Sequence, residues 1–340
     1  MPMKIWLLFL LQLLILNCSS DISKDFFLLV KKKDKKFVKS DTLEVQISNK
    51  KNHPIDSINY FLNKKRITKN FPLLNVKLGI HMLSAVVYSK GHNFEYNSKI
   101  TLLSDVKPKL YTYQIINVYP HDKNAYTQGL EFYRDTLFES TGLRGSSSIR
   151  KVNFKNGEVI EKKILDKVYF AEGITFLNQK LFQLTWQGNI GFQYNPDNLL
   201  VERSFNYQKS KEGWGLCNDG EFIYKSDGTS KIWILDPKNL KEISYIDVLT
   251  DKSRIKNINE LEFIDGKIYA NTYQFNRDVV IVINPSNGIV EKVIDFTGIR
   301  DRVTQNPNLD VMNGIAFINQ KMYVTGKNWD KLFEVKIVSK

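Results

Sequence analysis

The sequence predicts an all-β protein in which a small immunoglobulin-like β-sandwich precedes a five-bladed β-propeller. Short segments with apolar residues at alternate positions recur along most of the chain. Clusters of Asn, Lys, Pro and Gly separate them before residue 105, and a hairpin pattern repeats five times after residue 111. The chain has 340 residues, 42% of them hydrophobic, which is enough for two domains and excludes a disordered protein.

Residues 1–18 are predicted to be a lipoprotein-type signal peptide. Lys4 precedes an apolar stretch at 5–16, broken only by Gln12, and Cys18 follows soon after it. The stretch is shorter than the about 20 apolar residues that a transmembrane helix needs. A cysteine at this place resembles the acylated residue of bacterial lipoproteins, although Asn17 stands where a small residue is usual. The alternative is an ordinary signal peptide in which Cys18 has no role.

Lipidation of Cys18 would anchor the exported chain in a bacterial cell envelope, facing the periplasm or the cell exterior. Cys217 would then have no partner for a disulfide within the chain. Its place beside Leu216 on a predicted strand favours a small buried residue over a reactive thiol.

Residues 19–105 are predicted to form the sandwich, and residues 106–110, around Pro108, the linker to the propeller at 111–340. Strand candidates with alternating or apolar character lie at 26–30, 43–47, 58–62, 82–88 and 94–103. His53, His81 and His92 lack the close spacing of metal ligands. No catalytic grouping is therefore expected here, and the simplest role is a spacer.

The net charge of +13 comes mainly from this N-terminal part. Residues 19–105 carry 16 basic and 8 acidic side chains, whereas residues 106–340 carry 32 and 28. The surplus therefore does not lie on the larger domain, and nucleic acid is not expected as a partner. Attraction of the spacer to anionic lipid headgroups remains open.

Five fifteen-residue stretches between 111 and 340 align without gaps. Their starts are separated by 44, 42, 45 and 54 residues. Each reads as a strand, a polar turn such as Asn-Gln or Asp-Gly, and a second strand, and another strand pair follows each of the first four. Four strands in about 40–45 residues is the period of a propeller blade, and it distinguishes this fold from a β-sandwich or two stacked sheets.

The fifth unit has room for only three strands before the chain ends at Lys340. Residues 111–119 alternate as a strand should and precede the first repeat. They are predicted to supply the missing strand, so that the ring closes without a long open edge.

Equivalent positions of the repeats should converge at one end of the central channel, because the first strand of each blade lines it. The first column contains Gln128, Glu172, Trp214, Asn259 and Asn313. The fifteenth column contains Gly142, Trp186, Gly228, Tyr273 and Lys327. These residues differ from blade to blade, as expected of one asymmetric pocket, and a carboxylate, an ammonium, amides and aromatics suit a small polar ligand. In the alternative, Gln128 and Asn313 only bond blade ends, and Trp186, Trp214 and Trp329 wedge between blades.

Common catalytic and nucleotide-binding motifs are absent. The sequence has no GxGxxG, no P-loop, no HExxH and no GxSxG, and His121 is the only histidine after residue 110. This pattern disfavours nucleotide chemistry, zinc hydrolysis and a Ser-His-Asp triad. His121 follows Pro120 and is interpreted as a structural turn residue.

Ten short segments occur in order over about residues 111–337: YPHD at 119–122, YTQGL at 126–130, ESTGL at 139–143, EGI at 172–174, LTW at 184–186, GWGL at 213–216, SDGTS at 226–230, NELE at 259–262, NGIA at 313–316 and TGK at 325–327. Together they resemble the glutaminyl-peptide cyclotransferases of the plant and bacterial type. Those enzymes are five-bladed propellers, and the segments span all five repeats.

The resemblance implies that an N-terminal glutamine closes to pyroglutamate with release of ammonia. Glu172 would carry the proton, and Lys327 and Asn259 would hold the carboxamide and the developing oxyanion. Substrate binding would fall to Gln128, Trp186, Trp214, Tyr273 and Asn313, with Tyr273 standing where the family would have Trp. This chemistry needs no catalytic metal and no cofactor, and the expected partner is a peptide or protein that begins with glutamine.

Two other functions remain open on the sequence. One is a propeller without catalysis that binds peptide or glycan at the cell surface. The other is a lactone or ester hydrolase whose metal would be held by Glu172, Asn259 and Asn313. Lys327 at the same mouth of the channel would repel such a cation.

Overall fold

The computed structural model describes residues 22–340. The predicted signal peptide and its Cys18 lie outside these residues. The described chain is built from strands and two short 3-10 helices, η1 (Ile22–Asp25) and η2 (Arg300–Arg302). None of its helices combines the length and the apolar character needed to cross a bilayer.

By its contacts the chain divides into two compact units. One contains 22–35, Thr42–Phe71 and His81–Ile100, and the other contains Lys36–Asp41, Pro72–Ile80 and Thr101–Lys340. The predicted linker at 106–110 begins after strand β8, which ends at Leu103, and overlaps the first residues of β9, which begins at Lys109.

Strands β1 to β8 form two sheets. The three-stranded sheet, in spatial order, contains β1 (Phe26–Val30), β3 (Thr42–Asn49) and β6 (Asn70–Pro72). The five-stranded sheet, in spatial order, contains β2 (Lys36–Val38), β8 (His92–Leu103), β7 (Gly79–Ser89), β4 (Ser57–Leu62) and β5 (Lys65–Ile67). All five predicted segments are strands, and β7 buries alternate residues such as Leu83, Ala85 and Val87. The short strands β2, β5 and β6 were not predicted, because three residues show no usable periodicity.

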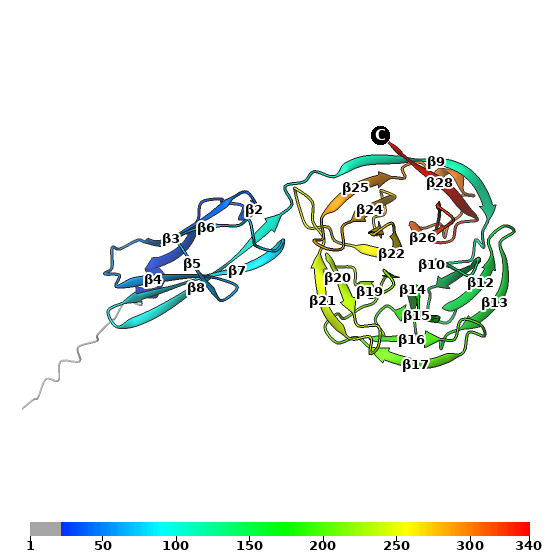
Figure 1. Ribbon diagram of the computed structural model, residues 1–340, viewed down its shortest axis with the longest axis horizontal. Coiled ribbons are helices and arrows are strands. Elements are labelled where there is room, and N and C mark those ends of the chain that lie inside the picture. The colour runs from blue at the N-terminus through cyan, green and yellow to red at the C-terminus, as the bar shows by residue number, and fades with distance from the viewer. Residues whose placement is uncertain (1–21) are drawn as a thin grey trace, which may run out of the picture. The chain divides into compact units, whose positions relative to one another are not determined.

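The remaining strands form five four-stranded blades around a ring, which Figure 1 shows face on; strand β9 joins blades 4 and 5 into one eight-stranded sheet. Blade 1 contains β10 (Thr127–Tyr133), β11 (Thr136–Thr141), β12 (Ser148–Asn153) and β13 (Glu158–Ile164). Blade 2 contains β14 (Ala171–Leu177), β15 (Lys180–Thr185), β16 (Ile190–Tyr194) and β17 (Val201–Asn206). Blade 3 contains β18 (Leu216–Asn218), β19 (Ile223–Ser226), β20 (Lys231–Leu235) and β21 (Glu242–Asp247). Blade 4 contains β22 (Ile258–Ile264), β23 (Lys267–Thr272), β24 (Val279–Ile283) and β25 (Val290–Asp295).

Blade 5 combines the two ends of the propeller segment. It contains β26 (Met312–Ile318), β27 (Lys321–Gly326), β28 (Lys331–Ser339) and β9 (Lys109–Pro120). Strand β9 pairs antiparallel with β28 along its length, and its first residues also pair with β25. The predicted five-bladed propeller and its closure by residues 111–119 are therefore confirmed.

The inner hairpins fold locally because their turns match the strand twist. In blades 1, 2, 4 and 5 two residues connect the inner strands, and all eight have positive φ, for example Asn178 at 51° and Gln179 at 58°. Two successive positive φ angles define the type I′ turn, whose twist fits antiparallel hairpins and which favours Asn, Asp and Gly. The polar turns in the sequence thus fix the register of the inner strand pairs in these four blades.

Candidate active site

The five residues of the first column lie at irregular backbone at the start of the inner strands. In blades 1, 2, 4 and 5 the register of the innermost pair shifts at this place, for example between Ala171 and Ile174 around Glu172. In blade 3 the inner strand begins only at Leu216, two residues after Trp214. A β-bulge turns a side chain away from the regular alternation of the strand. These bulges let the first-column side chains leave the sheet surface.

Glycines after the first column allow neighbouring inner strands to come close. A Cβ on Gly173 would stand 2.6 Å from the backbone nitrogen of Leu216 in the next blade. The Gly173 amide instead donates a hydrogen bond to the Trp214 carbonyl at 2.6 Å. The close approach narrows the ring at this end, so that side chains from several blades meet.

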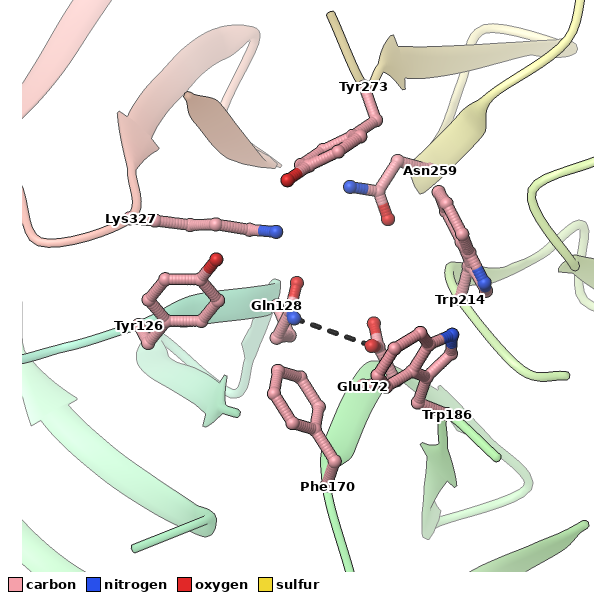
Figure 2. Close-up of a pocket in the computed structure, with 9 residues that line it drawn as sticks. All are labelled: Tyr126, Gln128, Phe170, Glu172, Trp186, Trp214, Asn259, Tyr273 and Lys327. Carbon is pink, nitrogen blue, oxygen red and sulfur yellow. Dashed lines mark hydrogen bonds between the residues drawn. The ribbon is translucent and has the colours of Figure 1, made fainter. Parts of the chain in front are cut away.

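They meet in a cavity of about 210 Å³. Its lining residues are Tyr126, Gln128, Phe170, Glu172, Trp186, Trp214, Asn259, Tyr273 and Lys327 (Figure 2). Seven of the eight residues predicted for catalysis and substrate binding are among them, including Glu172 and Lys327. This volume is below the about 300–1,000 Å³ of drug-sized pockets, so it suits a single side chain or amino-acid residue.

The eighth predicted residue, Asn313, does not line the cavity. Its side chain is fully buried, and its Nδ2 donates to the Thr127 carbonyl at 2.9 Å and to Gln128 Oε1 at 3.0 Å. Gln128 Nε2 in turn donates to Glu172 Oε1 at 3.3 Å. Because Asn313 occupies the oxygen of the Gln128 amide, the Gln128 nitrogen faces Glu172. Asn313 therefore contacts Gln128, which itself faces the cavity.

Burial determines the protonation of Glu172. The residue is 5% exposed, and loss of hydration raises the pKa of its carboxyl well above the usual value. The Lys327 ammonium opposes this shift, and the Glu212 carboxylate adds to it. A carboxyl group with a raised pKa is suited to accepting and returning a proton near neutral pH.

Lys327 reaches the cavity between two tyrosine rings. Its Nζ lies 4.8 Å from the ring centroid of Tyr126 and 4.8 Å from that of Tyr273. The ring faces attract the ammonium, and the Tyr126 hydroxyl is held by Asp310 Oδ2 at 2.7 Å. Burial lowers the pKa of Lys327, while Glu172 and Asp310 raise it. Within the described residues, no ion pair engages this ammonium directly, so its N–H groups are free to bind a ligand.

Asn259 offers an unsatisfied amide to the same space. The residue is 2% exposed, and no group of residues 22–340 forms a hydrogen bond with its Oδ1. Its amide group projects toward the centre of the cavity, opposite Gln128 (Figure 2). A buried acceptor without a partner costs free energy, which a ligand N–H group would recover on binding.

Two tryptophans of the pocket share one carboxylate. Trp186 Nε1 and Trp214 Nε1 both donate to Glu212 Oε2, each at 2.9 Å. The segment that carries Glu212 is held from behind by the fully buried Lys225, whose Nζ donates to the Glu212 carbonyl at 2.9 Å. Glu212 therefore fixes the two indole planes from outside the cavity.

The sequence prediction did not include Tyr126, Phe170 and Glu212. Each stands two residues before a first-column residue, namely Gln128, Glu172 and Trp214. Tyr126 and Phe170 line the cavity, and Glu212 supports its indoles from outside. A column read at this offset is a weaker signal than the first column, because its other two members, Asn257 and Val311, do not line the cavity.

Two glycines of the fifteenth column make room for aromatic walls. A Cβ on Gly228 would stand 2.6 Å from Trp214 Cζ2, and one on Gly142 would collide with the ring of Phe170. Phe170 also packs edge-to-face on Trp186, with ring centroids 5.7 Å apart. The absence of a side chain at Gly228 and Gly142 thus leaves the space that the rings of Trp214 and Phe170 occupy.

Taken together, the cavity presents a carboxyl that can exchange a proton, a cation and two amides between aromatic walls. This set can deprotonate an amine, stabilise an oxyanion and protonate a leaving group. Among residues 22–340, no group of three or more His, Cys, Asp or Glu side chains is placed to hold a metal ion. Cys217 is buried at 1% exposure as predicted, and burial raises the pKa of its thiol.

Comparisons with known proteins agree with this arrangement. A family model described as glutamine cyclotransferase matches residues 85–337. A glutaminyl-peptide cyclotransferase of Arabidopsis thaliana is 34% identical over 282 residues, which are 82% of this chain and 85% of the relative. The crystal structure of Myxococcus xanthus glutaminyl cyclase is similar at a TM-score of 0.64 and 32% identity, over 69% of this chain and 100% of that one.

Proposed function

The chain belongs to the glutamine cyclotransferase family, and we propose that Glu172 carries the proton as the protein converts an N-terminal glutamine to pyroglutamate and ammonia. One observation supports this role above the others. Glu172, Lys327 and Asn259, which come from three different blades, line the same small cavity. The substrate is a peptide or protein whose first residue is glutamine.

The reaction begins with attack by the substrate α-amine. Its free base adds to the γ-carboxamide carbon, so that a C–N bond forms and the carbonyl oxygen becomes an oxyanion. Glu172 as carboxylate accepts the proton that the attacking nitrogen loses. A side chain in this role typically contributes about 10²–10⁴ in rate.

The second step expels ammonia. Glu172 returns its proton to the former carboxamide nitrogen, the bond from the carboxamide carbon (Cδ) to this nitrogen breaks, and the oxyanion collapses to the lactam carbonyl. Lys327 donates to the oxyanion and Asn259 holds the substrate amide; loss of one such donor typically costs about 2.7–4 kcal/mol of transition-state stabilisation. Trp186, Trp214 and Tyr273 enclose the aliphatic part of the side chain and exclude water.

Ammonia release from a peptide that begins with glutamine tests this mechanism. The purified protein should release one ammonia per peptide, and Glu172→Gln should lower kcat by about 10²–10⁴ while the peptide still binds. Glu221→Gln, at an exposed turn of blade 3, is the matched control and should leave the rate unchanged. Tight binding of the peptide without release of ammonia would instead support the alternative of a propeller that binds peptides but does not catalyse a reaction. A Glu172→Gln variant with normal rate would remove Glu172 from the mechanism.

We also propose that the protein is exported and anchored to the cell envelope through a lipid on Cys18. The support is the apolar stretch 5–16 followed closely by this cysteine. In bacterial cells fed an alkyne-labelled fatty acid, the protein should take up the label and sediment with membranes. Cys18→Ser should abolish both the uptake of the label and the sedimentation with membranes. Uptake of the label by the Cys18→Ser variant would contradict the proposal.

A further inference from the structure

A second hollow begins on the outer side of the active-site wall. It measures about 730 Å³, and Trp214 and Glu212 contribute to its lining. Trp214 also lines the active-site cavity, so one indole separates the two spaces. We call this second hollow the basic groove, because five of its lining residues are cationic: Lys209, Lys211, Lys231, Arg254 and Lys256.

Among residues 22–340, two carboxylates line the groove, and both already accept hydrogen bonds. Glu212 binds the two pocket indoles, and Asp227 accepts hydrogen bonds from Thr229 and from Trp233 Nε1. Neither carboxylate forms an ion pair with a groove cation within the described chain. The groove therefore holds an excess of positive charge.

The cations differ in how far they are neutralised. Arg254 forms an ion pair with Asp247 at 2.5 Å, and Lys231 lies 3.9 Å from the ring centroid of Tyr245. Lys209, Lys211 and Lys256 are exposed, and no carboxylate of residues 22–340 pairs with them. Three unpaired ammonium groups at the rim of one groove would attract an anionic group.

We propose that the basic groove binds acidic side chains that follow the N-terminal glutamine of the substrate, so that the enzyme prefers peptides with Asp or Glu near their start. This inference rests on the proposed function. When the first residue fills the small cavity, the rest of the peptide must leave it, and a chain advances about 3.3–3.6 Å per extended residue. Because Trp214 lines both the cavity and the groove, the groove lies within reach of the residues that follow the glutamine.

A set of three peptides of equal length tests the proposal. They carry Asp-Asp, Asn-Asn or Lys-Lys after the first glutamine, so that Asn preserves the shape of Asp without its charge. The Asp peptide should have a kcat/KM roughly threefold to tenfold above that of the Asn peptide, mainly through KM, and the Lys peptide should be poorest. The preference should shrink as salt is raised, because the groove is open to solvent.

Substitution of the three free lysines supplies the control. Lys209→Gln, Lys211→Gln and Lys256→Gln together should abolish the preference while leaving turnover of the Asn peptide within about twofold. The matched variant replaces exposed lysines of blade 1, Lys155, Lys162 and Lys163, by Gln and should keep the preference.

The outcomes separate the two claims. Equal kcat/KM for the Asp and Asn peptides in the unmodified enzyme, or a preference that survives the triple substitution in the groove, would overturn the groove inference alone. Release of no ammonia from any peptide would overturn the proposed function and with it this inference. A uniform loss for all three peptides in the groove variant would assign these lysines to structure and also overturn it.

Discussion

At the scale of the residue, the pocket works through two opposite charges in a small, poorly hydrated space. Burial raises the pKa of Glu172 and lowers that of Lys327, while each group partly offsets the shift of the other. The raised pKa lets the Glu172 carboxyl exchange a proton as an acid–base group. The Lys327 ammonium lines the same cavity, where it can stabilise an anion. The aromatic walls cause the burial, so they contribute to catalysis as well as to binding.

The pH dependence of kcat/KM should report both groups. Activity should rise with pH on an acid limb above the ordinary glutamate value of 4.5, as Glu172 ionises, and fall on an alkaline limb below the ordinary lysine value of 10.5. Lys327→Met should lower kcat by about 10²–10³, remove the alkaline limb and move the acid limb to higher pH. The reason for this last shift is that the Lys327 charge lowers the pKa of Glu172. An alkaline limb that persists in the variant would contradict the assignment.

Glu212 lies outside the pocket but should also affect the pH dependence of kcat/KM. Its charge raises the pKa of Glu172, so Glu212→Gln should move the acid limb to lower pH while retaining an oxygen acceptor for the indoles. Glu212→Ala should instead raise KM about tenfold, because Trp186 and Trp214 lose their shared acceptor. Steady-state kinetics over pH separate the two effects. An unmoved acid limb in the Gln variant would leave Glu212 with a purely structural role.

At the scale of the element, each blade begins with a hairpin, and the residue that ends this hairpin varies among the blades. Type I′ turns such as Asn178-Gln179 set the register, and the bulge near the strand start turns the first-column side chain toward the channel. The fifteenth position then holds either a pocket residue such as Trp186 or a glycine such as Gly142. One repeated scaffold thereby yields an asymmetric site.

A methyl group at Gly142 should disturb the pocket through Phe170. The added Cβ would overlap the Phe170 ring, so Gly142→Ala should lower kcat/KM about tenfold by displacing this wall or the adjacent Gln128. In a Phe170→Ala background the same substitution should have much less effect. Activity of the four proteins forms a double-mutant cycle. Strictly additive losses would show that Gly142 acts elsewhere.

At the scale of the whole molecule, the ring is closed by backbone pairing and by a buried polar network. Strand β9 pairs with β28, and just after β9 His121 Nδ1 lies 2.7 Å from the Trp329 carbonyl while its Nε2 lies 3.0 Å from Glu139 Oε1. Arg150 Nε donates to Glu139 Oε2 at 2.9 Å. The network thus joins blade 1 to blade 5 across the closure. His121 is a structural residue, as its position beside Pro120 indicated.

Removal of the Glu139 charge should weaken this closure. Despite burial, Arg150 and His121 lower the pKa of Glu139 to about 2. The ion pair should therefore stabilise the fold fully above the ordinary glutamate value of 4.5 and lose this effect as pH falls through about 2. Glu139→Gln should lower the free energy of unfolding by about 3–5 kcal/mol at neutral pH, since it leaves the buried Arg150 with only the partly exposed Asp122 carboxylate as counter-charge.

Urea unfolding at pH 7 and at pH 3 tests this, with Glu221→Gln as the exposed control. The difference between the variant and the unmodified protein should shrink at the lower pH, because pH 3 lies below the ordinary glutamate value of 4.5, so Glu139 of the unfolded chain is mostly protonated and must lose that proton on folding. A difference that is the same at both pH values would mean that the loss is one of packing rather than charge.

The sequence by itself determined the longer strands, the inner turns, the five-fold repeat and the closure of the ring, but not the three-residue strands β2, β5 and β6. Alternation and turn chemistry act between neighbours in the chain, and the repeat period is visible without a structure. It also selected seven residues that line the cavity, because equivalent positions of a ring meet at its axis.

Only the tertiary structure decided the complete set of side chains that line the cavity and the shifts in the pKa values of its charged groups. The bulge around Glu172, which no local pattern announces, directs this side chain inward, whereas hydrogen bonds to Thr127 and Gln128 hold Asn313 behind Gln128. Contacts between blades bring in Tyr126 and Phe170 and set the shifted pKa values of Glu172 and Lys327. Burial and electrostatic coupling depend on distances between residues far apart in the chain, and those distances exist only once the ring has closed.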